Sequence, residues 1–322
     1  MVYIGLDLGG TKISGALFSE PNTILFLETL LLEEREGKAV AELIFTLCEK
    51  LIERGSVKED DEKSLGVCVP GIVWSKTGNV WAPNIPGWEN YPLRDELKSR
   101  FPHSLVNIES DRTCNILGET SRGASMGCKN VVFMAVGTGI GAGILVDGKI
   151  LHGASDIAGA IGWMALQPPY SNDYDQCGCF ETYASGTGIA RQAKNLVIAD
   201  PHYNGQLSQI PMNQLTAHDV FDALKSKDRI AIQVIDKAIE MWGMASANMV
   251  SLFNPEMVVF GGGIFGPAAE FIDTIYNEAQ KWAQPIAIKQ CRFSATQLPN
   301  LSGLYGAGAI AILNSQNNLI DN

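Results

Sequence analysis

The chain has 322 residues, of which 46% are hydrophobic and 18% are charged, and its formal net charge is -11. That length exceeds the size at which one hydrophobic core usually stops growing, so we expect two lobes with a cleft for a small molecule between them. The negative charge and the lack of a Lys/Arg cluster argue against nucleic acid as a partner. No run approaches the roughly 18 apolar residues that a membrane span requires.

The first residues and the cysteines indicate a cellular location. The N-terminal sequence MVYIGLDLGG runs directly into a strand-like segment, without the pattern of a secretory signal. Seven cysteines are scattered along the chain, and this odd number suits a reducing compartment. We therefore expect a cytoplasmic protein with no membrane partner.

The N-terminal part of the chain predicts an open, mixed sheet. Residues 2–6 and 13–18 have the composition of short strands, and the polar sequence DLGGTK between them forms a turn with glycine at its tip. Residues 23–32 predict a third strand. Residues 37–54 then predict a helix, and residues 65–71 predict a buried strand.

A strand gives way to a helix at Asp111. The sequence LVNIES at 105–110 has the pattern of a short strand, and a helical stretch runs from Asp111 through Arg122, with Gly123 closing its last turn. Aspartate at such a junction is commonly an N-cap, whereas a carboxylate at a strand end can also accept a proton as a general base. From the pattern alone, both interpretations of Asp111 stay open.

A second glycine turn follows the next strand. After the strand 130–136 come the run GTGIGAG, a strand ILV and the pair Asp147-Gly148, which is typical of a tight hairpin. Residues 10–18 and 137–145 share glycine, threonine and isoleucine at the same offsets, in the same strand-turn-strand context. This weak internal repeat predicts duplicated lobes.

The C-terminal third is mainly helical. Residues 265–283 carry apolar side chains at helical spacing, which predicts a helix packed on the core. These side chains are Ala268, Phe271, Ile272, Ile275, Ala279 and Trp282. A buried strand before them ends in residues 261–263, three glycines that let the backbone approach a flat or charged ligand closely. Residues 315–322 have the composition of a polar, frayed end.

Both glycine turns have the composition of a phosphate site. Backbone N–H groups can converge on phosphate oxygens where no side chain blocks the approach, and neighbouring hydroxyls add hydrogen bonds. A tight hairpin is the simpler interpretation of either turn alone. Their occurrence in two similar strand contexts favours nucleotide phosphates. The sequence has neither GxxxxGK[ST] nor a GxGxxG that opens a helix, so neither a P-loop nor a dinucleotide fold is indicated.

Six short motifs, in order, give the chain a resemblance to a known family. They are DLGGTK at 7–12, APNIPGW at 82–88, ESD at 109–111, VGTGIGAGILVDGKILHG at 136–153, CFETYASG at 179–186 and FGGGI at 260–264. Over residues 1–312 the chain resembles the ROK family of repressors and sugar kinases.

The resemblance implies an α/β fold, the two-lobed actin-like ATPase (ribonuclease H-like) architecture with duplicated mixed sheets flanked by helices. One lobe would comprise residues 1–117, completed by a C-terminal helix over 303–322, and the other lobe residues 118–302. The winged helix of the family's repressors is not expected, because the chain starts at the first strand. By family habit we expect a homodimer or a larger homo-oligomer.

The resemblance also implies ATP and Mg2+ as cofactors. It places phosphates on the two glycine turns and adenosine near the glycine triplet, and the residues are Gly9, Gly10, Thr11, Lys12, Gly137, Thr138, Gly139, Gly261, Gly262 and Gly263. Asp7 would face Mg2+ through water. Asp111 matches the family's catalytic aspartate, which favours a general base over an N-cap.

The substrate motifs depart from the family pattern. The family's kinases read Glu-Asn-Asp where this chain has Ser110 in the middle position, and the Glu and His of AGEIGH are here Ala160 and Trp163. Lost polar partners reduce discrimination between hydroxyl patterns, which argues against the commonest sugars. Trp163 either stacks on a substrate or fills core space. The implied substrate-binding residues are Asn84, Ser110, Trp163 and Glu181; for Glu181 the alternative is a first-turn glutamate favoured by the helix dipole.

A structural zinc is not expected. The family commonly holds zinc with one His and three Cys, whereas this chain has Trp163 at the His position and only Cys177 and Cys179 in the cysteine cluster. Two ligands do not close a tetrahedral site.

These observations lead to one leading hypothesis, an ATP-dependent kinase that phosphorylates a hydroxyl of a sugar or sugar-like polyol, with Asp111 as general base. The alternative is a non-catalytic sugar or nucleotide sensor that keeps the fold, which the three edited substrate positions favour. Retention of Asp111 and of both phosphate turns favours the enzyme. A DNA-binding repressor would need a basic recognition helix that the sequence lacks.

Overall fold

The computed structural model describes residues 1–58 and 61–318. Its contacts divide the chain into two units, each of which is discontinuous in sequence. Unit 1 contains residues 1–127, 150–158 and those from 296 onward, and unit 2 contains residues 128–149 and 159–295. The lobe boundaries expected from the sequence, at residues 117 and 302, stay a prediction.

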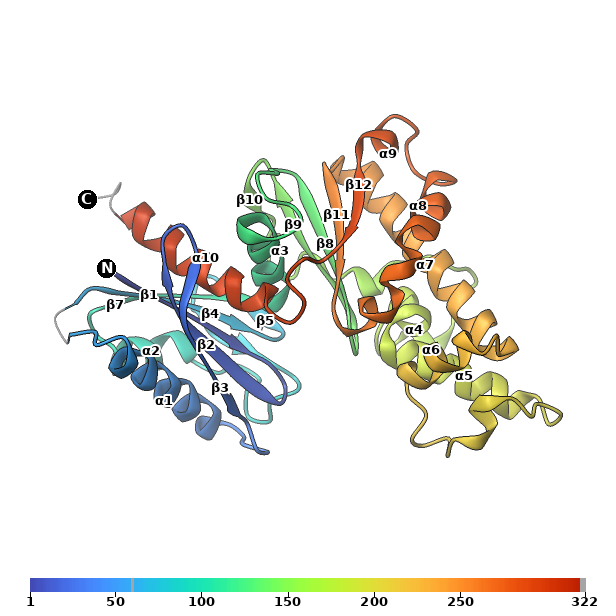
Figure 1. Ribbon diagram of the computed structural model, residues 1–322, viewed down its shortest axis with the longest axis horizontal. Coiled ribbons are helices and arrows are strands. Elements are labelled where there is room, and N and C mark those ends of the chain that lie inside the picture. The colour runs from blue at the N-terminus through green and yellow to red at the C-terminus, as the bar shows by residue number, and fades with distance from the viewer. Residues whose placement is uncertain (59–60, 319–322) are drawn as a thin grey trace. The chain divides into compact units, whose positions relative to one another are not determined.

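Unit 1 is built on a five-stranded mixed sheet with the order β3-β2-β1-β4-β7 (Figure 1). Its strands are β1 (Val2–Leu8), β2 (Lys12–Ser19), β3 (Thr23–Leu31), β4 (Lys63–Val69) and β7 (Ser104–Ser110). β1 pairs antiparallel with β2 and parallel with β4, and β4 pairs parallel with β7. A small antiparallel ribbon of β5 (Ile72–Val73) and β6 (Val80–Trp81) follows β4 in the chain.

Helices cover both faces of this sheet. They are α1 (Lys38–Arg54), α2 (Leu93–Arg100), α3 (Asp111–Arg122) and α10 (Ser302–Asn318). Apolar residues of α1 recur at helical spacing and pack on the face of β1 that carries Ile4 and Leu6. α10 packs on the opposite face, where it contacts β1 and β4. The approach is so close that a Cβ on Gly66 would overlap the carbonyl oxygen of Ala307, so only glycine fits there.

Unit 2 repeats this topology. Its five-stranded sheet has the order β10-β9-β8-β11-β12, with an antiparallel β8–β9 pair followed by parallel β8–β11 and β11–β12 pairs. The strands are β8 (Val131–Val136), β9 (Ile140–Val146), β10 (Lys149–Ile150), β11 (Met257–Gly261) and β12 (Arg292–Ala295). The same succession of hairpin and parallel strands in both sheets confirms the duplication that the glycine turns predicted.

The core of unit 2 is formed between its sheet and its helices. The helices are α4 (Cys179–Ala184), α5 (Gly186–Ala199), α6 (Ala217–Lys225), α7 (Arg229–Phe253), α8 (Ile272–Gln280) and α9 (Ala287–Gln290). α7 buries residues on most of its surface, among them Trp242, whose indole N–H donates to the Ala184 carbonyl at 3.1 Å. Short 3-10 segments complete the unit at Ile161–Trp163, Asn172–Tyr174, Gln206–Gln209, Gly263–Phe265 and Pro267–Phe271. Within the described part of the chain, no helix has the length and apolar character needed to cross a membrane.

Most elements expected from the sequence are confirmed, and the helix at Asp111 is confirmed to the residue. α3 begins at Asp111 and ends at Arg122, with Gly123 as its C-cap. Asp147 and Gly148 have φ values of 50° and 76° and form the turn between β9 and β10. Such positive φ values at both positions match the tight hairpin that the Asp-Gly pair predicted.

The single helix expected over residues 265–283 is wrong. Two 3-10 segments come first, and the α-helix begins only at Ile272. Pro267 has no backbone N–H to continue a preceding helix, and it stands at the first position of a new segment. Ala268 is fully buried as predicted, but Trp282 is 61% exposed, because α8 ends at Gln280 and no longer holds it against the core.

The frayed end expected from residue 315 is also wrong over residues 315–318, where α10 continues to Asn318. The rest of that prediction, residues 319–322, lies outside the described residues.

A buried carboxylate joins α3 to the segment that leads into α10. Glu119 is 0% exposed, and it accepts hydrogen bonds from the backbone N–H groups of Ala124 at 2.7 Å and of Gln297 and Leu298 at 3.3 Å. The Thr296 hydroxyl donates to the same carboxylate. Four donors from two distant parts of the sequence therefore depend on one side chain.

We expect the substitution Glu119→Ala to lower the free energy of unfolding by about 3 kcal/mol, because it leaves several buried donors without an acceptor. Urea denaturation followed by circular dichroism measures this loss. Glu53→Ala, which removes an exposed glutamate of α1, is the matched control and should change stability by less than about 0.5 kcal/mol. Equal stability of the two variants would contradict the anchoring role.

Candidate active site

The parallel strands of unit 1 carry a row of polar side chains near their carboxyl ends. Asp7 on β1 is in register with Cys68 on β4, and Cys68 is in register with Glu109 on β7, so the three side chains lie on one face of the sheet. A Cβ added to Gly303 would lie 2.8 to 3.0 Å from the Asp7 carboxylate oxygens. Burial raises the pKa of Asp7, while a hydrogen bond from Cys68 and the charge of Lys12 oppose the shift.

Asp111 begins α3 directly after β7. Its Oδ1 accepts a hydrogen bond from the Arg112 backbone N–H at 2.8 Å. Ser110 is the N-cap, since its hydroxyl accepts from the Thr113 backbone N–H at 3.4 Å, so the N-cap interpretation of Asp111 is wrong. Burial raises the pKa of Asp111 to about 6; Arg112 opposes this shift and the nearby charge of Asp7 adds to it.

The first glycine turn joins β1 to β2. The Gly9 N–H donates to the Lys12 carbonyl at 2.9 Å and closes the turn, and Gly10, Thr11 and Lys12 are exposed. Asn84 lies beside this turn, since a Cβ on Gly10 would be 3.3 Å from its amide nitrogen. Unit 1 thus brings together the expected phosphate turn and one expected substrate residue.

The second glycine turn joins β8 to β9 and is bonded to the start of α5. The Gly137 N–H donates to the Gly139 carbonyl at 3.0 Å, and the Gly137 carbonyl accepts from the Gly186 N–H at 2.8 Å. Ser185 caps α5 by accepting from the Gly188 N–H at 2.9 Å. Thr138 at the tip of the turn is exposed. A helix N-terminus beside the turn adds backbone donors that suit an anion.

Sequence reasoning missed Ser185 and Gly186 as neighbours of this turn. A signal was available, because residues 186–188 read Gly-Thr-Gly and repeat the sequence of residues 137–139.

The glycine triplet at the end of β11 lies next to the same turn. Gly261 is in register with Ala135, so β8 and β11 end at one edge of the sheet. Gly262 has a φ of 87°, and a Cβ there would overlap the Val136 carbonyl. A Cβ on Gly263, in contrast, would meet no atom within 4 Å. The backbone at Gly263 therefore faces open space, as an approaching ligand requires.

Glu181 packs against the segment that carries Ala160 and Trp163. Its carboxylate accepts from the Ile140 backbone N–H at 2.6 Å and would lie 2.9 Å from a Cβ on Gly162. Burial raises the pKa of Glu181, against the effects of this hydrogen bond and of Arg191. Trp163 is 58% exposed, so the interpretation of this side chain as core filling is wrong, and its indole is accessible to a ligand.

The cysteine pair lies beside Trp163. Gly178, between Cys177 and Cys179, packs so closely on the Trp163 backbone that a Cβ there would overlap it. The Cys177 sulfur is 3.5 Å from the Thr182 hydroxyl, and the Cys179 thiol donates to the Gln167 carbonyl at 3.9 Å. In the described residues, no three His, Cys, Asp or Glu side chains gather in a way that could hold a metal ion.

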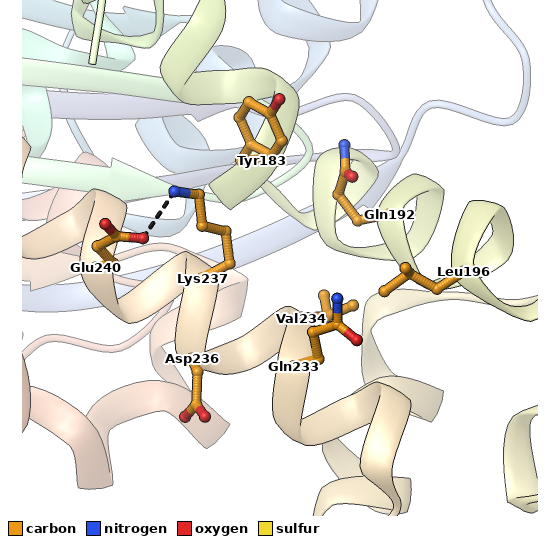
Figure 2. Close-up of a pocket in the computed structure, with 8 residues that line it drawn as sticks. All are labelled: Tyr183, Gln192, Leu196, Gln233, Val234, Asp236, Lys237 and Glu240. Carbon is orange, nitrogen blue, oxygen red and sulfur yellow. Dashed lines mark hydrogen bonds and ion pairs between the residues drawn. The ribbon is translucent and has the colours of Figure 1, made fainter. Parts of the chain in front are cut away.

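A cavity of about 400 Å³ in unit 2 has a different lining (Figure 2). It lies between α4, α5 and α7, where Tyr183, Gln192 and Leu196 face the charged side chains of α7. Lys237 pairs with Glu240 at 2.7 Å and lies 5.9 Å from the centre of the Tyr183 ring. None of the residues expected to bind nucleotide or substrate lines this cavity, so the cavity is separate from the expected site.

Two mixed sheets of the same topology, each with a glycine turn after its first strand, are the architecture of the actin-like ATPase class. Comparison with known proteins makes this specific. The family model described as "ROK family" matches residues 3–314.

Relatives and solved structures agree with the family match. The chain is 32% identical to a glucokinase of Halalkalibacterium halodurans over 310 residues, which cover 95% of this chain and 93% of the relative. It is 30% identical to an N-acetylgalactosamine kinase of Shewanella sp. over 321 residues, or 96% of each protein. The structure of a ROK family glucokinase from Streptomyces griseus in complex with glucose and AMPPNP is similar, with a TM-score of 0.76, 26% identity and coverage of 97% of this chain and 100% of that one.

The chain belongs to the ROK family. It is a carbohydrate kinase of that family, a phosphotransferase that acts on an alcohol group.

We expect Ser110→Ala to lower the free energy of unfolding by about 1 kcal/mol, because the first turn of α3 loses its side-chain acceptor. Ser110→Thr keeps a capping hydroxyl and serves as the matched variant, with most of that stability retained. Thermal unfolding of the two variants measures the difference. If Ser110→Ala melts together with Ser110→Thr, the cap contributes nothing to the start of α3.

Proposed function

We propose that this kinase transfers the γ-phosphoryl group of ATP to a hydroxyl of a sugar or sugar-like polyol, with Asp111 as the general base. The observation that carries the proposal is the state of Asp111. Its helix is already capped by Ser110, and burial holds the pKa of its carboxyl at about 6. A carboxylate with a pKa near the working pH is ionised often enough to act as a base and is basic enough to accept the proton of an attacking hydroxyl.

ATP and Mg2+ fit the residues at the strand ends. The turn from Gly9 to Lys12 and the turn from Gly137 to Gly139 offer backbone donors for phosphate oxygens, and Gly263, at the end of the glycine triplet, offers uncovered backbone for adenosine. Asp7 would hold Mg2+ through water, since a buried carboxylate with a raised pKa is stabilised by a cation. A single carboxylate suits Mg2+, which usually keeps several waters. When bound, the ion neutralises charge on the phosphate oxygens.

Each unit, taken by itself, offers one hydrogen-bonding side chain as a candidate for substrate binding. Asn84 offers an amide beside the first turn, and Glu181 offers a carboxylate beside the second. Ser110 acts through the cap that fixes the start of α3, because the residue is buried and its hydroxyl is already bonded to Thr113. Its contribution to substrate choice is therefore to hold Asp111.

Trp163 would select the substrate by stacking. The kinases similar to this chain include one named for glucose and one named for N-acetylgalactosamine, so relatives of equal similarity differ in their sugar. Ala160 and Trp163 replace polar positions with apolar surface, and an exposed indole offers a flat face to a sugar ring, a cyclitol or an acyl group. We propose a substrate that has such an apolar face. A cytoplasmic location and a homo-oligomeric state remain part of the proposal.

We expect Asp111→Asn to reduce phosphate transfer by about 100-fold to 10,000-fold, because the amide cannot accept the proton. Transfer from radiolabelled ATP to a panel of hexoses, acetamido sugars and cyclitols identifies the substrate and measures the loss. In the wild-type enzyme, kcat should rise with pH through about 6, as Asp111 loses its proton.

The control for this experiment is Asp222→Asn, which changes an exposed aspartate of α6 and should keep full activity and the same pH profile. Binding of an ATP analogue by Asp111→Asn, measured by calorimetry, confirms that the variant is folded. Equal transfer by Asp111→Asn and the wild-type enzyme would exclude Asp111 as the base.

We expect Trp163→Ala to raise KM for the productive sugar about 10-fold with KM for ATP unchanged, because stacking on an accessible aromatic ring contributes on the order of 1 kcal/mol. Trp163→Phe keeps an aromatic ring, so its KM for the sugar should lie between those of the wild-type enzyme and Trp163→Ala. Trp282→Ala is the matched control, since Trp282 is 61% exposed and Trp163 is 58% exposed. A KM for the sugar that moves no further in Trp163→Ala than in Trp282→Ala would contradict the stacking role.

A further inference from the structure

Residues 150–158 form a short segment of unit 1 between two stretches of unit 2. The segment folds back on itself, because the Ala158 N–H donates to the His152 carbonyl at 3.1 Å. Gly153, inside this loop, has a φ of 75°, and a Cβ there would be 3.2 Å from Ala158. The segment is therefore a closed loop, and two of its side chains bind other parts of unit 1.

The first anchor of this loop is an ion pair. His152 Nε2 lies 3.1 Å and 3.2 Å from the two carboxylate oxygens of Glu109. The Glu109 side chain is only 18% exposed and the His152 side chain 38% exposed, so solvent screens the pair less than it screens a surface ion pair. The hydrogen bond to Glu109 raises the pKa of His152, and the charges of Glu109 and Asp156 add to this effect while desolvation opposes it.

The second anchor is Asp156. Its carboxylate accepts from the Ser75 backbone N–H at 3.1 Å and from the Ser75 hydroxyl at 3.2 Å. The Asp156 backbone has a φ of 59°, a left-handed conformation that costs energy for a residue with a side chain. Arg94 in turn holds the turn that contains Ser75, because it donates to the carbonyls of Ser75 and Lys76 at 3.1 Å and 2.8 Å. Asp156 therefore keeps an unfavourable backbone conformation in which it can bind a rigid turn.

The first anchor lies at the end of the strand that leads to Asp111, and the second holds the same loop to Ser75. Within the described residues, β7 is an edge strand of its sheet and pairs with β4 alone. Glu109 is in that end, two residues before Asp111. Ser75 and Glu109 also line one small cavity of about 50 Å³ together with Asn107 and Arg94. The loop 150–158 thus contacts the carboxyl end of β7 through His152 and is held to the neighbouring turn through Asp156.

We propose that His152 and Asp156 are positioning residues, which hold the carboxyl end of β7 so that Asp111 keeps its orientation for catalysis. The inference rests on the proposed role of Asp111 as general base. Neither side chain touches the reacting atoms. Small displacements of a reacting group are costly in catalysis, so loosening either anchor reduces kcat more than it changes KM for ATP.

The ion pair between His152 and Glu109 depends on pH. Glu109 on β7 and Asp156 on the loop itself are the charged groups that face His152, and both favour its protonated form. Because the pKa of His152 is raised in the folded protein, the ion pair is complete at low pH and is lost as pH rises through that pKa. The kinase should therefore have an alkaline decline in kcat that belongs to His152, separate from the rise through about 6 that belongs to Asp111.

The test compares His152→Gln with His218→Gln, an exposed histidine of α6. In His152→Gln we expect kcat to fall about 10-fold at neutral pH, KM for ATP to stay constant, the alkaline decline to disappear and the rise through about 6 to remain. Hydrogen exchange provides a readout independent of activity, and the amides of residues 108–113 should exchange about 10-fold faster in this variant.

A second pair of variants separates the hydrogen bonds of Asp156 from its backbone strain. Asp156→Gly removes both, and Asp156→Asn keeps an acceptor and tolerates the left-handed conformation. We expect Asp156→Gly to lose more kcat than Asp156→Asn, although glycine relieves strain. If His152→Gln matches His218→Gln in kcat, pH profile and exchange while Asp111→Asn is inactive, the inference is overturned and the proposed function stands. Full transfer by Asp111→Asn overturns the proposed function itself.

Discussion

The parallel pairing of β1, β4 and β7 in register is the constraint on which the chemistry of unit 1 depends. It places Asp7 and the end of β7 at one edge of the sheet, with Cys68 between Asp7 and Glu109. Asp7 and Asp111 are therefore close enough for the charge of one to raise the pKa of the other. Burial raises the pKa of both carboxylates, while Lys12 opposes the shift at Asp7 and Arg112 opposes it at Asp111.

The sequence was a good guide to this framework because its signals are local. Apolar segments and glycine turns predicted the strands. The parallel pairing of β8 with β11 repeats the pairing of β1 with β4. The start of α3 at Asp111 was also predictable, since a polar junction separates an apolar run from a helical one. What the pattern left open was which residue caps the helix. That choice depends on backbone angles at Ser110, whose extended conformation lets its hydroxyl reach Thr113.

The features that sequence reasoning missed depend on contacts between distant residues. His152 and Glu109 are 43 positions apart, and no spacing rule connects them. The exposure of Trp163 was undecidable for the same reason, because an aromatic residue at a family position can be core or surface until its neighbours are known. The late start of α8 is a different case, since Pro267 stands in the sequence and limits how far one helix can extend over the periodic pattern.

The close packing of α10 on β1 and β4 has a consequence for biosynthesis. The sheet of unit 1 ends with β7 at Ser110, yet the helix that covers one of its faces begins only at Ser302. The chain is synthesised from its N-terminus. The face of the sheet at Gly66, which α10 covers in the folded protein, therefore stays exposed while all of unit 2 is translated. Unit 2, whose residues are complete at 295, can close first. The first residues to be made thus belong to the last unit to be finished, and the nascent sheet needs protection from aggregation in the interval.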